Sequence, residues 1–323
     1  MKVSFLVFLS VVSFSSASSA VSLFVSESGT GDSCISADPC SSIQQAVDIA
    51  ESGDTIHVAA GTYVENIKLG TPQTPNTKSN ITIKGAGADE TFVVSAGNSS
   101  QRPAGIPADI VFDVWSSGVT IEKLTASHPA GDVIGRDIGV FAGPPASNMV
   151  LQRCEIVRNR SGEYPAGPGS RGVLVFRAIN TVVSRNTLSG SYEDHIHMPT
   201  STSEISRNSV YDATRLGIVI IQETADSDNS GNTISRNTVD GSGSDGIQVQ
   251  GDNNEVSRND VTNNGGAAIK LCGIDEIGDC VMPFDQWSEA EGNTVSRNIF
   301  SGNGVAGIVD NGTDNILNRN QFE

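Results

Sequence analysis

The sequence predicts an all-β protein in which short strands stack as successive turns of one long coil. First, a short unit recurs through most of the 323 residues. Second, each copy is rich in Val, Ile and Thr and is bounded by Gly, Asn, Ser and Asp, which is typical of strands and turns. Third, no helical period of 3.6 residues continues across a copy. A unit this short cannot bury its apolar face alone, so we expect the copies to stack on one another.

The repeated unit has an Arg-Asn pair near its centre, and successive matched arginines are separated by 32, 22, 29, 22, 39 and 22 residues. The copies are 148–156 (NMVLQRCEI), 180–188 (NTVVSRNTL), 203–210 (SEISRNSV), 232–239 (NTISRNTV), 254–261 (NEVSRNDV), 293–300 (NTVSRNIF) and 315–322 (NILNRNQF). A second strand motif lies between these copies: GVFA (139–142), GVLV (172–175), HIHM (195–198), GIVI (217–220), GIQV (246–249), AIKL (268–271) and GIVD (307–310). Each turn of the coil therefore contains several short strands.

The N-terminal residues predict a signal peptide followed by a segment that caps the coil. Residues 1–20 combine Lys2, an apolar run and a small-residue stretch, which predicts a secretory signal peptide. Residues 21–53 are expected to form a cap segment with a short helix, N-capped by Ser41, whose apolar face closes the coil. Residues 54–323 are expected to form the coil itself. No later stretch is apolar enough to span a membrane, so we expect a secreted, extracellular protein, which we interpret as a monomer.

This organisation resembles the right-handed parallel β-helix of the pectate-lyase-like superfamily and its generic β-helix repeat proteins. The resemblance covers residues 54–323, and the stretch 43–69 is similar to the usual start of such domains, with a helix and then a first coil with a GTY turn. It implies a single-stranded parallel β-helix of roughly ten coils with a short N-terminal capping helix.

Alternation along the second motif predicts which side chains face the core. One inward column is Val140, Val173, Ile196, Ile218, Ile247, Ile269 and Ile308. A second is Ala142, Val175, Met198, Ile220, Val249 and Leu271. The residues between them are expected to face outward: Phe141, Leu174, His197, Val219, Gln248, Lys270 and Val309. The same rule predicts an outward column of Gly139, Gly172, His195, Gly217, Gly246, Ala268 and Gly307. His195 and His197 would then share the outer face of one strand.

The stretch YEDHIH carries the best candidate site. It resembles the active strand of the mannuronan C5-epimerase and alginate-lyase group, in which a Tyr is followed three residues on by an Asp and two further by a His. Tyr192 and His197 keep that spacing, and His195 stands in the place of the Asp. For removal of the C5 proton of a uronate, His197 is predicted to be the base, Tyr192 the acid, and Arg215 with His195 the group that binds the carboxylate.

Residues further along the same face are predicted to bind neighbouring units of a polymer. Gln248 and Lys270 follow on the next strands, and Trp287 is a loop aromatic that could stack on a sugar ring. The arginines of the repeat are interpreted as a solvated structural face, with polyanion binding as the alternative. The acidic loop residues are interpreted as solubilising, with Ca²⁺ binding as the alternative: Asp226, Asp228, Asp275, Glu276 and Asp279.

Cysteine spacing and net charge narrow the function class. Cys34 with Cys40, and Cys272 with Cys280, are spaced for local disulfides in an oxidising compartment. Cys154 replaces an inward asparagine of the repeat and is expected to be an inert buried thiol. The net charge of −17 argues against a nucleic-acid partner.

The sequence thus predicts a secreted carbohydrate-active protein, and we favour a polysaccharide lyase or C5-epimerase acting on an acidic polysaccharide. The alternative is a non-catalytic extracellular carbohydrate-binding, surface or copper-associated β-helix protein, the last resembling accessory proteins of nitrous-oxide reductase. In the copper case, His195 and His197 would supply two imidazoles. In a third, structural interpretation, the last coil, which lacks a predicted cap, pairs with another chain.

Overall fold

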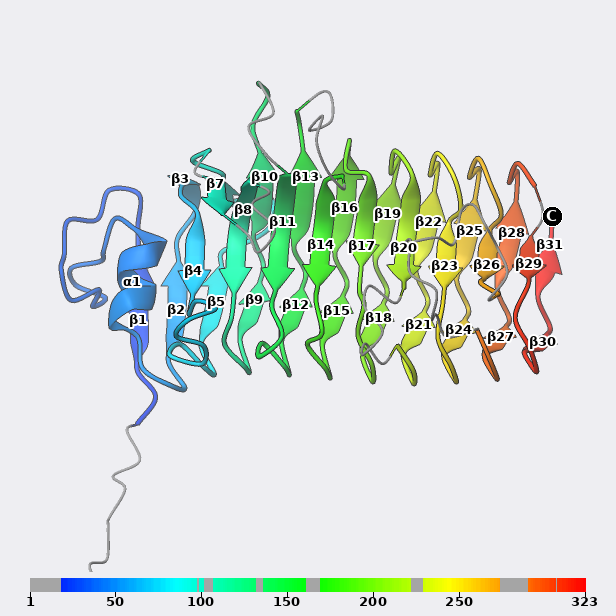
Figure 1. Cartoon of the computed structure of the whole chain (residues 1–323). Helices are drawn as coiled ribbons and strands as arrows, with labels where there is room; N and C mark the ends of the chain where they lie inside the picture. The colour runs from blue at the N-terminus through cyan, green and yellow to red at the C-terminus, as the bar shows by residue number, and fades with distance from the viewer. Residues whose placement is uncertain are drawn as a thin grey trace, which may run out of the picture.

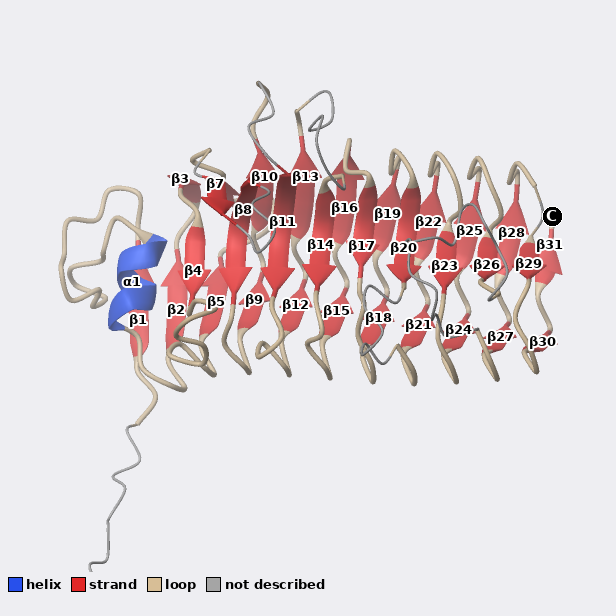
Figure 2. Ribbon diagram, viewed as in Figure 1, coloured by secondary structure: helices blue, strands red, loops and turns tan. Residues whose placement is uncertain are grey.

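The computed structural model of the chain describes residues 19–97, 99–101, 107–131, 136–160, 169–221, 229–273, 290–305 and 307–323. It confirms the right-handed parallel β-helix, because the chain winds repeatedly through three long parallel sheets that run side by side along the molecule (Figure 1). Strands make up nearly all of the described regular structure, with one helix at the N-terminal end (Figure 2). No helix among the described residues is long and apolar enough to cross a bilayer. The predicted signal peptide lies outside the described residues except for its last two.

The first sheet contains β1 (Ser22–Val25), β2 (Thr55–Val58), β5 (Thr82–Gly85), β9 (Thr120–Glu122), β12 (Val150–Gln152), β15 (Val182–Ser184), β18 (Glu204–Ser206), β21 (Thr233–Ser235), β24 (Glu255–Ser257), β27 (Thr294–Ser296) and β30 (Ile316–Asn318). The second contains β3 (Gly61–Val64), β6 (Thr91–Val94), β10 (Thr125–His128), β13 (Glu155–Arg158), β16 (Thr187–Gly190), β19 (Ser209–Tyr211), β22 (Thr238–Asp240), β25 (Asp260–Thr262), β28 (Ile299–Ser301) and β31 (Gln321–Phe322).

The third sheet contains β4 (Ile67–Leu69), β8 (Pro107–Val114), β11 (Arg136–Ala142), β14 (Arg171–Val175), β17 (Asp194–His197), β20 (Leu216–Ile220), β23 (Ile247–Val249), β26 (Ile269–Leu271) and β29 (Ile308–Asp310). The short strand β7 (Ser99–Gln101) pairs with β8 and is antiparallel to it. Each sheet therefore takes a strand from nearly every coil. Among the described residues the sheets have 11, 10 and nine parallel strands, with β7 as the tenth strand of the third, in agreement with the expected count of roughly ten coils.

The capping helix α1 (Ile43–Ile49) closes the N-terminal end of the coil. Its predicted buried face is confirmed, since Ile43, Ala46 and Val47 are buried. The predicted cap residue is wrong by one position: Ser42, and not Ser41, accepts a hydrogen bond from the backbone N–H of Gln45. The Glu65 carboxylate accepts from two further N–H groups of the first turn, so a residue of the first coil completes the cap.

The predicted inward columns are confirmed in register and burial. Successive members are paired across adjacent strands of the third sheet: Val140, Val173, Ile196, Ile218, Ile247, Ile269 and Ile308. All but Ile308, which packs against it, belong to one continuous core that also contains the second column. The outward position of the column from Phe141 to Val219 is also confirmed, because Phe141, Leu174 and Val219 belong to separate clusters outside that core.

The Arg-Asn pairs of the repeat form a corner of the coil. All seven matched arginines are exposed and have φ between +55° and +58°: Arg153, Arg185, Arg207, Arg236, Arg258, Arg297 and Arg319. This left-handed residue turns the chain, so the following asparagine points inward. Asn237 is typical: its Oδ1 accepts from the backbone N–H and the Nδ2 of Asn208, one coil earlier, at 2.9 and 3.0 Å. These asparagine ladders satisfy turn backbone that would otherwise be buried without partners.

The sequence-based expectations for the cysteines are confirmed for those that lie among the described residues. Cys34 and Cys40 form a disulfide. Cys272 is also disulfide-bonded, and its predicted partner Cys280 lies outside the described residues. Cys154 is a buried free thiol whose pKa burial raises to about 12, as expected for an inert side chain.

Candidate functional site

Strand β17 is not a regular alternating strand. In its pairing with β14, Asp194 is the register partner of Arg171 and Ile196 that of Val173, while His195 has no register partner on β14. Asp194 and His197 consequently lie on the outer face of the third sheet, whereas His195 and Ile196 both point into the coil. The predicted outward position of His195 is therefore wrong. Its side chain is fully buried and meets the edge of the Tyr192 ring, 5.8 Å between centroids, inside the core.

The glycines that occupy the His195 position in other coils explain the error. A Cβ on Gly217 would lie 2.4 Å from Cγ1 of Val239, and one on Gly139 would lie 2.5 Å from Cγ2 of Ile156. Both neighbours are core residues. The recurring glycine thus reflects a crowded inner corner and not a smooth outer trough, because any larger side chain there needs room made for it.

His195 is held neutral inside this corner. Burial lowers its pKa to about 4, because the opposing effects of the Asp194 charge and of backbone groups at Asp212, Gly190 and Tyr211 are smaller. A neutral imidazole is the form that such a site tolerates, since an unpaired buried charge is far more costly than a neutral polar group.

We expect His195 to make the protein acid-labile. Its folded pKa of about 4 lies below the ordinary 6.5, so between those two values the unfolded chain binds a proton that the folded protein does not. Stability is therefore fully present above pH 6.5 and falls as the pH drops towards 4, by up to about 3 kcal/mol. The measurement is the difference in unfolding free energy between wild type and His195→Asn at pH 7 and pH 4.5. The half-buried His57 is the control. Parallel losses in wild type, His57→Asn and His195→Asn would contradict the assignment.

The outer face of β17 carries an Asp–His pair. Nδ1 of His197 lies 2.9 Å from Oδ2 of Asp194, and the carboxylate can only accept, so the Nδ1–H donates and the lone pair is on Nε2. Arg171 Nε and Arg215 Nη2 approach the same Asp194 oxygen at 3.1 and 2.8 Å. Burial alone would raise the pKa of Asp194, but Arg171, His197 and Arg215 outweigh it and lower that pKa to about 2. The carboxylate is thus ionised and fixes the imidazole tautomer.

Glu193 completes this outer-face site, which we define as Arg171, Glu193, Asp194, His197 and Arg215. The Glu193 carboxylate lies 2.8 Å from Arg215 Nε and 3.3 Å from Arg171 Nη1. Three successive coils supply the five residues, so the stacking of the coils builds the site. Of the two guanidinium groups, that of Arg215 reaches solvent: 40% of its side chain is exposed, against 6% for Arg171.

Apolar side chains border the outer-face site on both sides along the coil axis. Towards the N-terminus is a cluster of Ala108, Ile110, Trp115, Ile138, Phe141 and Leu174. Towards the C-terminus are Leu216, Val219 and Ile221. The charged group is therefore flanked by apolar side chains along the coil axis, which strengthens its internal electrostatic interactions.

The remaining predicted binding residues are only partly described. Gln248 and Lys270 follow Val219 in register on β23 and β26, as expected. Gln248 is fully buried, and its Nε2 lies 3.3 Å from Sγ of Cys272, whereas Lys270 is half-buried. Trp287 and the acidic residues Asp226, Asp228, Asp275, Glu276 and Asp279 lie outside the described residues.

Tyr192 does not join His197. Its side chain is fully buried in the core, where its hydroxyl lies 3.0 Å from Nδ1 of His128. Nε2 of His128 lies 3.1 Å from the backbone oxygen of Asp109, which can only accept, so His128 carries its proton on Nε2 and Tyr192 donates to Nδ1. Burial raises the pKa of Tyr192 well above 10 and lowers that of His128. The predicted Tyr192–His197 acid–base pair is therefore not assembled.

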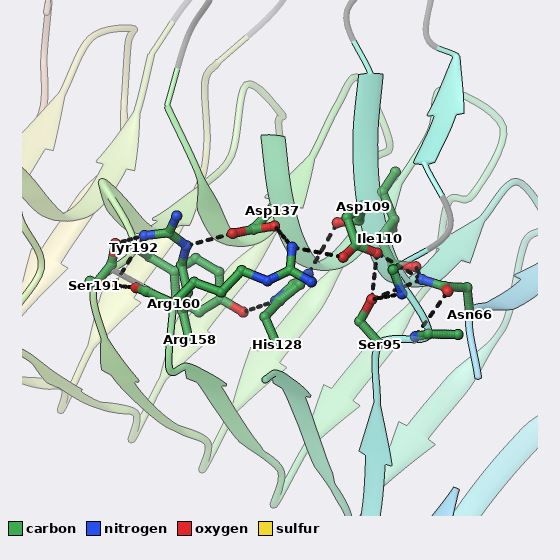
Figure 3. Close-up of polar contacts among 12 residues, drawn as sticks. Asn66, Ser95, Asp109, Ile110, His128, Asp137, Arg158, Arg160, Ser191 and Tyr192 are labelled. Carbon is green, nitrogen blue, oxygen red and sulfur yellow. Dashed lines mark hydrogen bonds and ion pairs between the residues drawn. The ribbon is translucent and has the colours of Figure 1, made fainter. Parts of the chain in front are cut away.

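His128 and Tyr192 belong to a buried network that sequence reasoning missed (Figure 3). It lies where the second and third sheets meet, and we call it the corner network: Ser95, Asp109, His128, Asp137, Arg158, Arg160 and Tyr192. Arg158 Nε donates to Asp137 at 2.7 Å, and Arg160 Nη1 lies 2.7 Å from Asp137 and 3.0 Å from Asp109. One sequence signal was available: Arg158 lies two residues after the inward Ile156 on one strand, an unusual place for a charge.

The histidines cannot share a metal ion in the predicted way. His195 points into the coil and His197 away from it, so the two imidazoles of β17 lie on opposite sides of the strand. Within the part of the chain that the structure describes, one group of three potential ligands lies close together: Asp109, His128 and Asp137. Its carboxylates are already bound by Arg158 and Arg160, so the group as it stands does not fit a metal ion.

Comparison with known proteins places the chain in a family. No curated protein matches its sequence. Among solved structures, a rhamnogalacturonan lyase and a complex of XylC with xylose each have a TM-score of 0.53 at 11% identity, covering 87% of this chain and 68% and 67% of theirs. The A-module of a mannuronan C-5 epimerase from Azotobacter vinelandii, AlgE6, has a TM-score of 0.42 at 15% identity over 87% of this chain and 93% of its own. The likeness to the first two structures concerns the fold alone. The model of the family described as periplasmic copper-binding protein (NosD) matches residues 47–323. The chain therefore belongs to the NosD family of parallel β-helix proteins.

Proposed function

We propose that this protein is an exported enzyme that cleaves a uronate-containing polysaccharide by proton abstraction, with the outer-face site as its active site. The observation that carries the proposal is the Asp194–His197 pair, in which an ionised carboxylate orients an imidazole with its basic nitrogen directed away from it. A Cys34–Cys40 disulfide supports an oxidising compartment outside the cytoplasm.

Four of the five residues of the site have a role in this reaction. Nε2 of His197 takes the proton from the carbon next to the uronate carboxylate, and the electron pair of that C–H bond forms the C4–C5 double bond as the C4–O bond breaks. The guanidinium of Arg215, which is the exposed edge of the site, binds the substrate carboxylate and stabilises the charge that develops on it. Asp194 and Glu193 hold His197 and Arg215 in place.

The position of Tyr192 favours a lyase over an epimerase. An epimerase returns a proton to the opposite face of the sugar ring and so needs a second proton-transfer group beside the substrate. Tyr192, the predicted second group, lies in the core and bonds to His128. Elimination requires only the base and the carboxylate-binding group, since water can protonate the leaving oxygen.

A screen of soluble polyuronates tests the proposal directly. The purified protein is incubated with polygalacturonate, alginate, hyaluronan and heparan sulfate, and the ultraviolet absorbance of the unsaturated product is followed. Appearance of that absorbance with one substrate supports a lyase. Shortened chains without unsaturated ends would indicate a hydrolase, and proton–deuterium exchange without cleavage an epimerase. Either outcome, or no reaction at all, would contradict the proposal.

Copper handling is the second candidate, favoured by the family to which the chain belongs. Copper would draw on imidazole, thiolate or thioether ligands. The described histidines are dispersed: His57 on the first sheet, His128 and His195 inside the coil and His197 on its outer face. They do not form a common site, so no step of the reaction is assigned to copper. Calorimetric titration with Cu²⁺ of wild type and of a His195→Ala, His197→Ala double variant tests this candidate.

A further inference from the structure

The corner network contains two carboxylates and an imidazole in a geometry that would suit a metal ion. Asp109 on β8 and Asp137 on β11 are register partners on adjacent strands. His128 ends β10 and faces the same inner corner. One potential ligand atom from each of these residues lies within 4.8 Å of the other two, and all three side chains are fully buried. Two carboxylates and one imidazole form a ligand set that zinc accepts.

A side chain of the protein occupies the position that a cation would take. The single atom Nη1 of Arg160 lies 2.7 Å from Oδ1 of Asp137 and 3.0 Å from Oδ2 of Asp109. Figure 3 shows this guanidinium between the two carboxylates, with His128 beside it. Arg158 Nε binds the other oxygen of Asp137 at 2.7 Å. The two aspartates are therefore balanced by two arginines.

We propose that Arg160 is an internal counter-cation that fills a latent metal site made of Asp109, His128 and Asp137, so that loss of the guanidinium converts the corner network into a site for a first-row divalent metal ion. The inference is independent of the polysaccharide reaction, since none of these residues belongs to the outer-face site. It also gives a physical reason why this member of a family described as copper-binding has no open metal site at the corner network.

Charge and space both favour a metal ion once Arg160 is shortened. Removal of the guanidinium leaves Asp109 and Asp137 with Arg158 as their remaining cation, so one buried negative charge is uncompensated. The Arg160 side chain is only 6% exposed, so its truncation leaves space beside the two carboxylates.

The imidazole can become a ligand while keeping Tyr192 as a hydrogen-bond partner, with loss of its bond to the backbone oxygen of Asp109. In the native network Nε2 of His128 carries the proton. If the proton moves to Nδ1, then Nδ1–H donates to the Tyr192 hydroxyl oxygen, and Nε2, which lies 3.1 Å from the backbone oxygen of Asp109 in the native network, is left with a lone pair. The Tyr192 hydroxyl can then donate to the backbone oxygen of Val157, which lies 3.4 Å away. The change of tautomer therefore leaves no donor without an acceptor, but it removes the donor that the backbone oxygen of Asp109 has in the native network.

The test compares the full-length wild type with Arg160→Ala by calorimetric titration with Zn²⁺ and by thermal unfolding with and without Zn²⁺. We expect Arg160→Ala to bind one Zn²⁺ and to gain about 5 °C or more in unfolding midpoint in excess metal. The wild type should show neither effect. Titration with Co²⁺ should give Arg160→Ala, and not the wild type, the visible absorption of a protein-bound ion.

Two matched variants distinguish binding of Zn²⁺ at the corner network from a non-specific effect of Zn²⁺ on a destabilised protein. Arg160→Met removes the same charge but keeps a long side chain in the corner, so it should be destabilised without gaining the Zn²⁺ site. Arg160→Ala combined with Asp137→Asn should lose the site. If Arg160→Ala fails to fold, refolding in Zn²⁺ and in a chelator replaces the titration: recovery only in Zn²⁺ supports the proposal. Three results would overturn the proposal. The first is a folded Arg160→Ala protein on which Zn²⁺ has no effect, and the second is an Arg160→Ala protein that does not recover in Zn²⁺ although Arg160→Met folds. The third is a Zn²⁺ site in the wild type that Asp137→Asn abolishes.

Discussion

Replacement of His197 by alanine is expected to lower kcat/KM on the responsive polyuronate by about 10²–10⁴-fold, the usual contribution of a positioned general base. The carbon acid next to a uronate carboxylate loses its proton slowly without a base, and His197 is the imidazole that Asp194 orients on the outer face. The measurement is the initial rate of unsaturated-product formation under subsaturating substrate, with circular dichroism to verify that the variant folds.

His57 provides the matched control for His197. It is a half-buried histidine on β2 of the first sheet, where it stacks on Phe24 with 5.2 Å between ring centroids. His57→Ala should keep wild-type kcat/KM, because the first sheet carries no part of the outer-face site. Equal losses in His57→Ala and His197→Ala would mean that fold stability limits the rate. A folded, fully active His197→Ala protein would remove His197 from the reaction.

Asp137→Asn is expected to destabilise the protein by about 3–5 kcal/mol, the usual cost of leaving one partner of a buried ion pair uncompensated. Asp137 is fully buried and holds two arginines, Arg158 and Arg160, both at 2.7 Å. The amide keeps the shape of the side chain but not its charge, so the corner would retain more positive charge than Asp109 alone can balance. The unfolding midpoint should fall by about 5–10 °C.

Asp260→Asn is the control for this substitution. Asp260 begins β25, and its side chain is exposed to solvent. Its replacement should change stability by no more than about 0.5 kcal/mol, as for most surface positions. A similarly small effect for Asp137→Asn would show that the corner network does not depend on charge compensation.

The sequence was sufficient to predict the coil and most of its faces, for a physical reason. The Arg-Asn corner and the Val/Ile columns recur because each coil must match its neighbours. Repetition in the sequence therefore indicates which residues stack on one another in the structure. Alternation then assigned Ile196 and His197 correctly. It failed at His195, because the chain bends there and two successive side chains face inward. The crowding around Gly139 and Gly217 identifies that bend, and this crowding involves residues from other strands.

The corner network could not be predicted for a different reason. Asp109, His128, Asp137 and Arg160 are dispersed over four segments in the early coils, where the 22-residue repeat is irregular. Only the stacking of β8, β10, β11 and β13 brings them together. The outer-face site was predicted in part: His197 and Arg215 were identified, but Asp194, which contacts them both, was not, because His195 was placed at the Asp position of the motif.

The asparagine ladders affect how the number of coils in this protein can change during evolution. From Asn186 onward, each amide in this ladder bonds to an equivalent asparagine on the next coil: Asn208, Asn237, Asn259, Asn298 and Asn320. A coil of this part therefore offers the same amide above and below. A tandem duplication of one 22-residue unit, such as 238–259, would find matching partners on both sides. Gene duplication can thus lengthen this region one coil at a time. The corner network combines five different residue types and is not built from one repeated side chain, so it allows no such change.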